Sequence, residues 1–113
     1  MSGDRMRRVD EAIREVLSDS LGPAGDLQDP RIGFVTVTDV KTSADLRHAR
    51  VYVTVLGNDK QRTESLAGLQ SAHGVLQRRV NGELRMMRTP TLQFHYDDTT
   101  DRAMRMEQLL DDD

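Results

Sequence analysis

Apolar residues recur at two different spacings along this chain, and the change of spacing divides it into helices and strands. Between residues 4 and 21 the spacing is three or four positions, which predicts a helix with one apolar stripe. The members of this stripe are Met6, Val9, Ile13, Val16 and Leu17. Over 33–40 and 47–56 apolar and polar residues alternate, which predicts two half-buried strands. A third alternating segment, over 91–96, predicts a strand that begins directly after Pro90.

A long helical pattern separates the second strand from the third. It runs over residues 62–80, and one glycine, Gly74, interrupts it. Because glycine inside a helix costs ~1 kcal/mol relative to alanine, Gly74 predicts a kink or a close approach of another group. Asn81 and Gly82 are typical of the residues that end a helix. The apolar stripe of this segment consists of Leu66, Leu69, Ala72, Leu76 and Val80.

The order of these elements predicts the architecture. The first two strands are close in sequence and are expected to pair antiparallel, whereas a helical crossover makes the second and third parallel. The helices must cover the apolar face of the sheet, which predicts a two-layer α+β sandwich in a single domain over residues 1–113. Residues 100–110 favour a short terminal helix. The opposite face of the sheet is polar and consists of Thr36, Thr38, Arg50, Tyr52, Thr54, Gln93 and His95.

Composition excludes several classes of protein. The 113 residues include no cysteine, which excludes disulfide scaffolds and thiolate metal sites and fits an intracellular protein. No apolar run in the sequence is long enough for a membrane span or a signal peptide. Two Phe, two Tyr and no Trp cannot supply a stacking platform for many nucleic-acid bases.

Charge is strongly segregated along the chain, although the net charge is only −3. Residues 47–96 carry a local charge of +5, and residues 97–113 carry a local charge of −5. Because charges are screened beyond ~8–10 Å at physiological salt, a phosphate partner responds to the local field. The basic middle is therefore either a surface for a polyanion or an ordinary solvated face. The short acidic C-terminal segment, 98–113, predicts that a nucleic acid docks away from it.

Motifs for catalysis and metal binding are missing from the sequence. There is no Walker-type loop, no Gly-x-Gly-x-x-Gly turn and no His-Glu-x-x-His motif. His48 and His95 share the outward side of their strands, either as neighbours in a metal or proton-shuttle pair or as two exposed histidines. Adjacent Asp97 and Asp98 point to opposite faces, which favours a strand-end turn over a shared acid–base site. We expect no catalytic residue, no cofactor and no bound metal.

The interrupted helix offers a binding surface. On an idealised helix Ser71, Gly74 and Arg78 lie opposite the apolar stripe, and the later Arg85 falls on the same side. A gap in side-chain cover beside arginines lets a phosphate approach the backbone while a guanidinium holds it. If a helix restarts at Gly74, its N-terminal amides add a partial positive charge. The alternative is that Gly74 only permits close packing and that the arginines are solvated.

The arginines of the first helix also either contact phosphate or belong to an ordinary solvated surface. Arg7 and Arg14 flank Glu11 at spacings of four and three residues. Such spacings suit surface ion pairs worth ~0.2–0.5 kcal/mol each. The other interpretation is that these arginines contact phosphate.

Short segments spread over the chain match the pattern of a known family. They are Arg8-Val9, Asp29-Pro30-Arg31-Ile32-Gly33, Val37-Thr38, Ser43-Ala44-Asp45-Leu46, Ala49-Arg50-Val51-Tyr52-Val53, Ala72-His73-Gly74, Pro90-Thr91-Leu92-Gln93-Phe94 and Met104-Arg105-Met106. In this order and spacing the chain resembles the ribosome-binding factor A family over about residues 5–110. The resemblance implies a type II KH-like two-layer sandwich of order helix-strand-strand-helix-helix-strand. In that family an Ala-x-Gly interhelical kink replaces the usual Gly-x-x-Gly loop, and Ala72-His73-Gly74 is similar to that kink.

The resemblance also implies a function. Family members bind the free or immature 30S subunit and its 16S rRNA, assist late maturation and 5′-end processing of that rRNA, and matter most in cold growth. This implies a cytoplasmic, monomeric, non-catalytic factor that holds an RNA conformation, works beside other assembly factors including a GTPase, and contacts no membrane. Gln77 and Met87 depart from the family, in which basic residues are common at both positions. The candidate RNA-binding residues are Arg7, Arg8, Arg31, Ser71, Ala72, Gly74, Arg78, Arg79, Arg85 and Arg88.

Two other functions stay open at the level of the sequence. A protein-interaction module would act through the exposed sheet face, with Arg50 and Tyr52 as its contact residues. A small hydrolase would use His48 or His95. Loss of all partners after nuclease digestion would separate RNA binding from the first of these alternatives.

Overall fold

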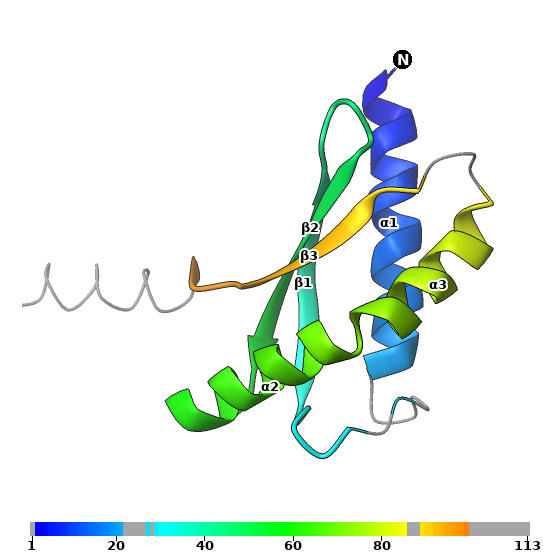
Figure 1. Cartoon of the computed structure of the whole chain (residues 1–113). Coiled ribbons are helices and arrows are strands. Elements are labelled where there is room, and N and C mark those ends of the chain that lie inside the picture. Colours follow the sequence, from blue (N-terminus) through cyan, green and yellow to red (C-terminus); the bar gives the residue numbers. More distant parts are fainter. Residues whose placement is uncertain (1, 22–26, 28, 86–88, 100–113) are drawn as a thin grey trace, which may run out of the picture.

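A three-stranded sheet with helices packed against it makes up the described part of the chain (Figure 1). The computed structural model describes residues 2–21, 27, 29–85 and 89–99. The elements, in chain order, are α1 (Ser2–Leu21), β1 (Val35–Thr42), β2 (His48–Val55), α2 (Asp59–Ser71), α3 (His73–Leu84) and β3 (Thr91–Tyr96). This helix-strand-strand-helix-helix-strand order confirms the expected α+β fold of the type II KH-like class. The terminal helix expected over 100–110 lies outside the described residues.

β2 is the central strand of the sheet. It pairs antiparallel with β1, where Val35 lies opposite Val55, and parallel with β3, where Val51 lies opposite Phe94. Both pairings were expected from the connections, because a short turn joins antiparallel strands and a helical crossover joins parallel ones. Alternation along β2 puts its four apolar residues in the core.

A β-bulge in β1 changes which residues face the core. Thr38 is an extra residue between Val37 and Asp39, the two positions that pair with consecutive residues of β2. Beyond the bulge Val40 and Thr42 are buried, although continued alternation would have turned both outward. The strand both begins and ends two residues later than the predicted range of 33–40.

The core lies between the sheet and the three helices. The predicted stripe of α1 supplies Val9, Ile13 and Leu17, while Met6 and Val16 are half-buried at its margin. Among the described residues, no helix is both long enough and apolar enough to cross a membrane. The buried apolar residues are Val9, Ile13, Leu17, Leu21, Val35, Val37, Val40, Ala49, Val51, Val53, Val55, Leu69, Ala72, Leu76, Val80, Leu92 and Phe94.

The segment that leads into β1 is docked onto α2 through a glycine and a serine. Gly68 lies so close to this segment that a Cβ on it would be 2.6 Å from Cγ1 of Ile32. The hydroxyl of buried Ser65 accepts a hydrogen bond from the Gly33 N–H at 3.1 Å and donates to the Arg31 carbonyl at 3.3 Å. These contacts hold residues 31–33 against the helix and set the point at which β1 begins.

The helical pattern over 62–80 folds as two helices that meet at Ala72. The backbone of Ala72, at φ −85° and ψ 1°, leaves the helical region. Its N–H still donates to the Gly68 carbonyl at 2.9 Å, and its carbonyl accepts from the Leu76 N–H at 3.0 Å. The chain therefore changes direction at Ala72 while the backbone hydrogen bonds on either side are kept.

α3 ends later than the sequence predicts. The prediction that Asn81 and Gly82 end the helix is wrong, because the helix continues to Leu84. Arg85 caps it in the left-handed conformation, with φ 51°, and its N–H donates to the Asn81 carbonyl at 3.1 Å. A left-handed residue stops helix propagation, and here an arginine takes the place that glycine usually has.

Gly68→Ala is expected to destabilise the protein through overpacking. The added methyl must displace Ile32 or Arg31, which costs ~1–3 kcal/mol, while alanine gains up to ~1 kcal/mol in helix propensity. Gly82→Ala is the matched control, because an added Cβ there meets no atom within 4 Å. Urea denaturation should give Gly68→Ala a free energy of unfolding that is ~1–3 kcal/mol lower than that of Gly82→Ala. Equal values for the two variants would contradict the close packing at Gly68.

Candidate nucleic-acid interface

The join between α2 and α3 exposes three of the predicted site residues. Ser71, Gly74 and Arg78 all lie on the solvent side of the two helices. The Arg78 guanidinium lies over Gly74, since a Cβ built on this glycine would be 3.7 Å from Arg78 Nη1. No described side chain caps the first turn of α3. The join therefore combines an exposed glycine, the positive end of a helix dipole and a guanidinium group.

Ala72 belongs to the core and not to this surface. Its side chain is only 8% exposed, and it packs with the other buried residues between the helices and the sheet. Ala72 therefore shapes the join from the inside, and its methyl group presents no contact surface to a partner.

Two side chains of α3 hold the join against the free edge of β3. The His73 Nε2–H donates to the Leu92 carbonyl at 2.9 Å, and the Gln77 Oε1 accepts from the Leu92 N–H at 2.9 Å. Gln77 also donates from Nε2 to the Pro90 carbonyl at 2.9 Å. Since β2 pairs with the other edge of β3, these bonds satisfy backbone groups that the sheet leaves unpaired.

The chemistry of these contacts suits a glutamine at position 77. An amide side chain both donates and accepts hydrogen bonds, whereas a guanidinium only donates. An arginine at this position would therefore leave the Leu92 N–H without its acceptor. His73, the middle residue of the kink, also faces inward, where its ring meets Phe94 edge-on at 6.4 Å.

The docking of residues 31–33 onto α2 brings Arg31 to the same helix as the join. Arg31 Cβ would lie 3.3 Å from a Cβ on Gly68, one turn before Ala72. Asp29 orients the arginine, accepting bonds from its Nε at 3.2 Å, its Nη2 at 2.9 Å and its backbone N–H at 2.9 Å. These hydrogen bonds lower the pKa of Asp29 and raise the pKa of Arg31. The Arg31 side chain is 47% exposed, so its oriented guanidinium is accessible to a partner.

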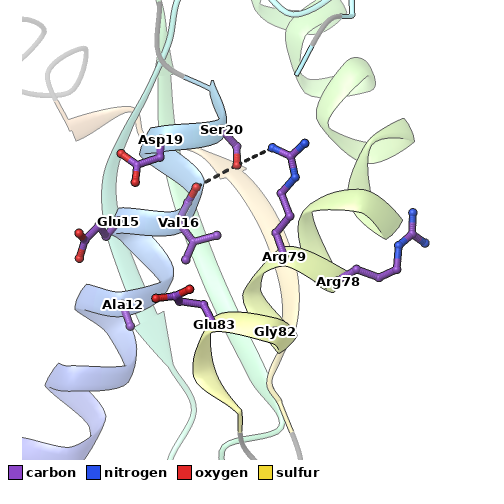
Figure 2. Close-up of a pocket in the computed structure, with 9 residues that line it drawn as sticks. All are labelled: Ala12, Glu15, Val16, Asp19, Ser20, Arg78, Arg79, Gly82 and Glu83. Atoms are coloured by element: carbon purple, nitrogen blue, oxygen red, sulfur yellow. Dashed lines mark hydrogen bonds between the residues drawn. The ribbon is translucent and has the colours of Figure 1, made fainter. Parts of the chain in front are cut away.

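Arg79 lies in the groove between α1 and α3 and not at the join (Figure 2). Its Nη1 donates to the Ser20 hydroxyl at 3.0 Å, and this hydroxyl donates in turn to the Val16 carbonyl at 3.0 Å. Arg78 also lines this groove, but its side chain points away from α1 in Figure 2. The groove has a volume of about 510 Å³, and its lining includes three carboxylates, Glu15, Asp19 and Glu83. Those carboxylates repel phosphate, so the geometry favours Arg79 as a link between two helices.

The remaining predicted arginines lie away from the join. Arg85 follows α3, and at ~1.5 Å of rise per residue it is ~16 Å from Gly74 along the helix axis. Arg7 forms an exposed ion pair with Glu11 at 4.0 Å, and Arg8 is exposed beside it. Arg88 lies outside the described residues. The structure thus groups Ser71, Gly74, Arg78 and Arg31 at α2 and the start of α3.

Of the two interpretations of the strand histidines, the structure supports two separate, exposed side chains and not a neighbouring pair. His48 lies opposite Thr91, whereas His95 lies opposite Tyr52, with their ring centroids 5.7 Å apart. Four positions of β2 separate the two histidines, a distance of ~13 Å along the strand. Within the described ranges no group of three or more His, Asp or Glu side chains is placed to hold a metal ion.

The predicted strand-end turn at Asp97 is confirmed. Its Oδ1 accepts from the Thr99 N–H at 2.9 Å, which closes a turn over the end of β3. Its Oδ2 accepts from the Thr38 hydroxyl at 2.6 Å, and Thr38 is the bulged residue of β1. These hydrogen bonds, chiefly the one from Thr38, lower the pKa of Asp97 to about 2.

Sequence reasoning missed the residues that hold the site in place. Ser65, Gly68 and Gln77 carry no recognised motif, and each acts on a segment distant in the sequence. One signal was present for the contact to β3. His73 and Gln77 are polar and one helical turn apart, next to the buried stripe of α3, which is the spacing that two anchors on one strand require.

Comparison with known proteins connects this architecture with one family. The family described as "Ribosome-binding factor A" matches residues 5–110. Ribosome-binding factor A of Geobacter metallireducens is 45% identical over 106 residues, which cover 94% of this chain and 88% of that protein. The protein of the same name from Halothermothrix orenii is 39% identical over 110 residues, which cover 97% of this chain and 88% of that protein.

Solved structures show the same fold. The crystal structure of ribosome-binding factor A from Thermus thermophilus superposes with a TM-score of 0.67 at 24% identity, covering 80% of this chain and 94% of that chain. A homology model of the Thermus thermophilus factor, fitted into the cryo-EM map of its complex with the 30S subunit, gives a TM-score of 0.60 at 26% identity. That match covers 82% of this chain and 91% of the other.

Gln77→Ala is expected to destabilise the protein by unpairing backbone groups of β3. Leu92 is only 2% exposed, and an unsatisfied buried N–H costs ~1–3 kcal/mol. Urea denaturation should show this loss, and hydrogen exchange should show lower protection of the Leu92 N–H. Gln70→Ala, at an exposed position of α2, is the control and should keep the protection of the Leu92 N–H. Unchanged protection at Leu92 in Gln77→Ala would refute the role of Gln77.

Thr38→Val is expected to raise the pKa of Asp97 from about 2 toward 3.8. The hydroxyl stabilises the ionised carboxylate, so the native state gains stability above the unfolded pKa and loses it as the pH falls toward about 2. An NMR titration of the side-chain carboxyl carbon measures this shift. Thr36→Val, on an exposed position of the same strand, is the control and should leave the titration unchanged. If both variants titrate like the parent, the hydroxyl is not the cause.

Proposed function

This chain belongs to the ribosome-binding factor A family, and we propose that it binds the free or immature small ribosomal subunit by gripping 16S rRNA at the α2–α3 join. A related protein fitted into the map of a 30S complex supports this choice of partner. The proposal treats residues 1–113 as one domain that acts as a monomer in the cytoplasm.

The Arg78 guanidinium over Gly74 is the observation that carries the proposal. A phosphate that approaches the first turn of α3, which no side chain of the described residues caps, meets the positive end of the helix dipole. Gly74 has no side chain to block this approach, and Arg78 reaches back over it with a planar group that suits two phosphate oxygens. Ser71, exposed at the end of α2, adds a hydroxyl donor next to the same turn.

Two further groups of arginines extend this surface. Arg31 approaches from the docked segment and is held ready by Asp29, so binding a phosphate costs it little side-chain entropy. Arg7, Arg8, Arg85 and Arg88 would contact other phosphates of a folded RNA that follows α3 and the start of α1. Among the candidate residues Arg79 is the least suited to contact RNA, because its guanidinium bonds to Ser20 in the groove.

Binding of this kind acts by holding an RNA conformation, and it needs no bond to be made or broken. Neutralised phosphates let RNA segments approach that would otherwise repel each other. We assign to it a role in late maturation and 5′-end processing of 16S rRNA. The role is greatest in the cold, where rearrangements of RNA over high barriers are slow. Release from the subunit then falls to other assembly factors, including a GTPase.

The open face of the sheet supports a second candidate, a contact with a protein. Half-buried Tyr52 lies against exposed His95, and exposed Arg50 is two positions away on the same face. In that case Tyr52→Ala would disrupt complexes that survive nuclease digestion. Loss of all partners on digestion favours the RNA surface instead.

Arg78→Glu combined with Arg85→Glu is expected to weaken binding to purified small subunits. Each lost phosphate contact should reduce the slope of log affinity against log salt by about 1. Filter binding over a range of salt concentrations measures both quantities. Arg47→Glu is the control, because Arg47 is exposed next to β2 in the turn from β1 and lies outside the proposed surface. Unchanged affinity and slope in the double variant would contradict the proposed surface.

The same variants test the step in maturation. In a strain that lacks the factor and grows in the cold, Arg47→Glu should restore growth and mature 16S 5′ ends. The double variant should restore neither, because the RNA conformation is no longer held. Full complementation by the double variant would separate the maturation role from the α2–α3 join.

A further inference from the structure

Phe34 and Leu56 form an exposed apolar pair at one end of the sheet. They are the large apolar side chains that the described part of the chain leaves exposed, at 69% and 74%. The Leu56 N–H donates to the Phe34 carbonyl at 3.0 Å, so the two residues lie side by side, next to the Val35–Val55 pair. Since Val35 and Val55 point into the core, alternation directs Phe34 and Leu56 to the open face of the sheet.

The backbone on both sides of this pair is held in place. Before Phe34, the Gly33 N–H donates to the hydroxyl of buried Ser65. After Leu56, Asn58 and Gln61 form a reciprocal capping box at the start of α2, with N–H to side-chain bonds of 2.8 and 2.9 Å. An aromatic ring on a fixed backbone is ready for binding, because little conformational entropy is lost when it is covered.

The neighbourhood of the pair indicates what covers it. Arg31 precedes Phe34 by three residues, so their Cα atoms are at most ~10 Å apart. The Arg31 guanidinium is hydrogen-bonded to Asp29, and its side chain is 47% exposed. In Figure 1 the segment before β1 and the end of β2 lie at the end of the sheet that α2 crosses, away from the β1–β2 hairpin. Leu56 precedes the first residue of α2 by three positions, so the pair lies beside the start of the helix whose other end forms the join.

The size of the pair argues for a base and against a folded protein. A stable protein interface buries ~800 Å² on each partner, which two side chains cannot supply. A single base needs only one ring face, and any base stacks on an aromatic ring. Single-stranded RNA is recognised through such splayed-out bases, with arginine on the adjoining phosphates.

We propose that Phe34 stacks on an unpaired base of the rRNA, with Leu56 against the edge of that base and Arg31 on a neighbouring phosphate. The inference rests on the proposed function and extends the RNA surface from the α2–α3 join onto the open sheet face. It assigns to Phe34 a contact with a base, whereas the join contacts only the backbone of the RNA.

Three substitutions of Phe34 distinguish stacking from a general apolar contact. Phe34→Ala removes the ring and should weaken binding ~5- to ~150-fold, the range found when a stacking residue is truncated. Phe34→Leu keeps apolar area without a ring face and should weaken binding nearly as much. Phe34→Tyr keeps the ring and should bind within about twofold of the parent. Since the side chain is 69% exposed, thermal unfolding of all three should match the parent.

The full chain is titrated against purified small subunits and against protein-free 16S rRNA. Base stacking is supported if Phe34→Ala and Phe34→Leu lose affinity for both probes while Phe34→Tyr keeps its affinity. Parent-like binding by Phe34→Leu overturns it in favour of an apolar contact. If Phe34→Ala loses affinity for subunits but keeps full affinity for protein-free rRNA, base stacking is overturned and Phe34 contacts a ribosomal protein instead.

Arg78→Glu, titrated in parallel, separates this inference from the function on which it rests. If Arg78→Glu loses affinity and Phe34→Ala does not, the join binds RNA and the stacking contact is refuted. If neither variant loses affinity, both the stacking contact and the proposed RNA surface fail.

Discussion

The need to satisfy the free backbone edge of β3 determines where α3 lies. Leu92 is buried, and its N–H and carbonyl point away from β2, so each requires a partner from outside the sheet. His73 and Gln77 supply these partners from successive turns of α3 and fix the rotation of that helix. With this rotation Gly74 and Arg78 face solvent. The exposed surface of the join thus follows from hydrogen bonds made by the residues that directly precede Gly74 and Arg78.

Close packing of α2 against the segment before β1 has a similar effect. Because Gly68 has no side chain, residues 31–33 lie directly on the helix, and Ser65 bonds to their backbone. Arg31 belongs to this docked stretch and Phe34 directly follows it, so the backbone of both residues is held in place. A guanidinium and an aromatic ring, the two groups best suited to phosphate and base, are therefore presented from one short segment.

Charge separates the surfaces of the molecule by function. The groove between α1 and α3 contains Glu15, Asp19 and Glu83, and the Arg79 guanidinium bonds to Ser20 there. Arg78, one residue earlier on α3, points away from α1 (Figure 2). Neighbouring arginines of one helix thus have different roles, one linking two helices and one facing a partner, because successive helical residues point ~100° apart.

The order of the elements, the parallel and antiparallel pairings and the presence of a break in the long helix could be predicted from the sequence, because apolar spacing and glycine placement act over short stretches of chain. The break itself lies at Ala72, two residues before Gly74. Features that depend on distant partners are visible only in the folded chain. The Thr38 bulge shifts the register of β1, Gln77 bonds to a strand beyond the next loop, and His95 meets Tyr52 instead of His48. Periodicity fixes the face on which a residue lies, whereas register between strands and the acceptor of each edge N–H are set by segments far apart in the chain.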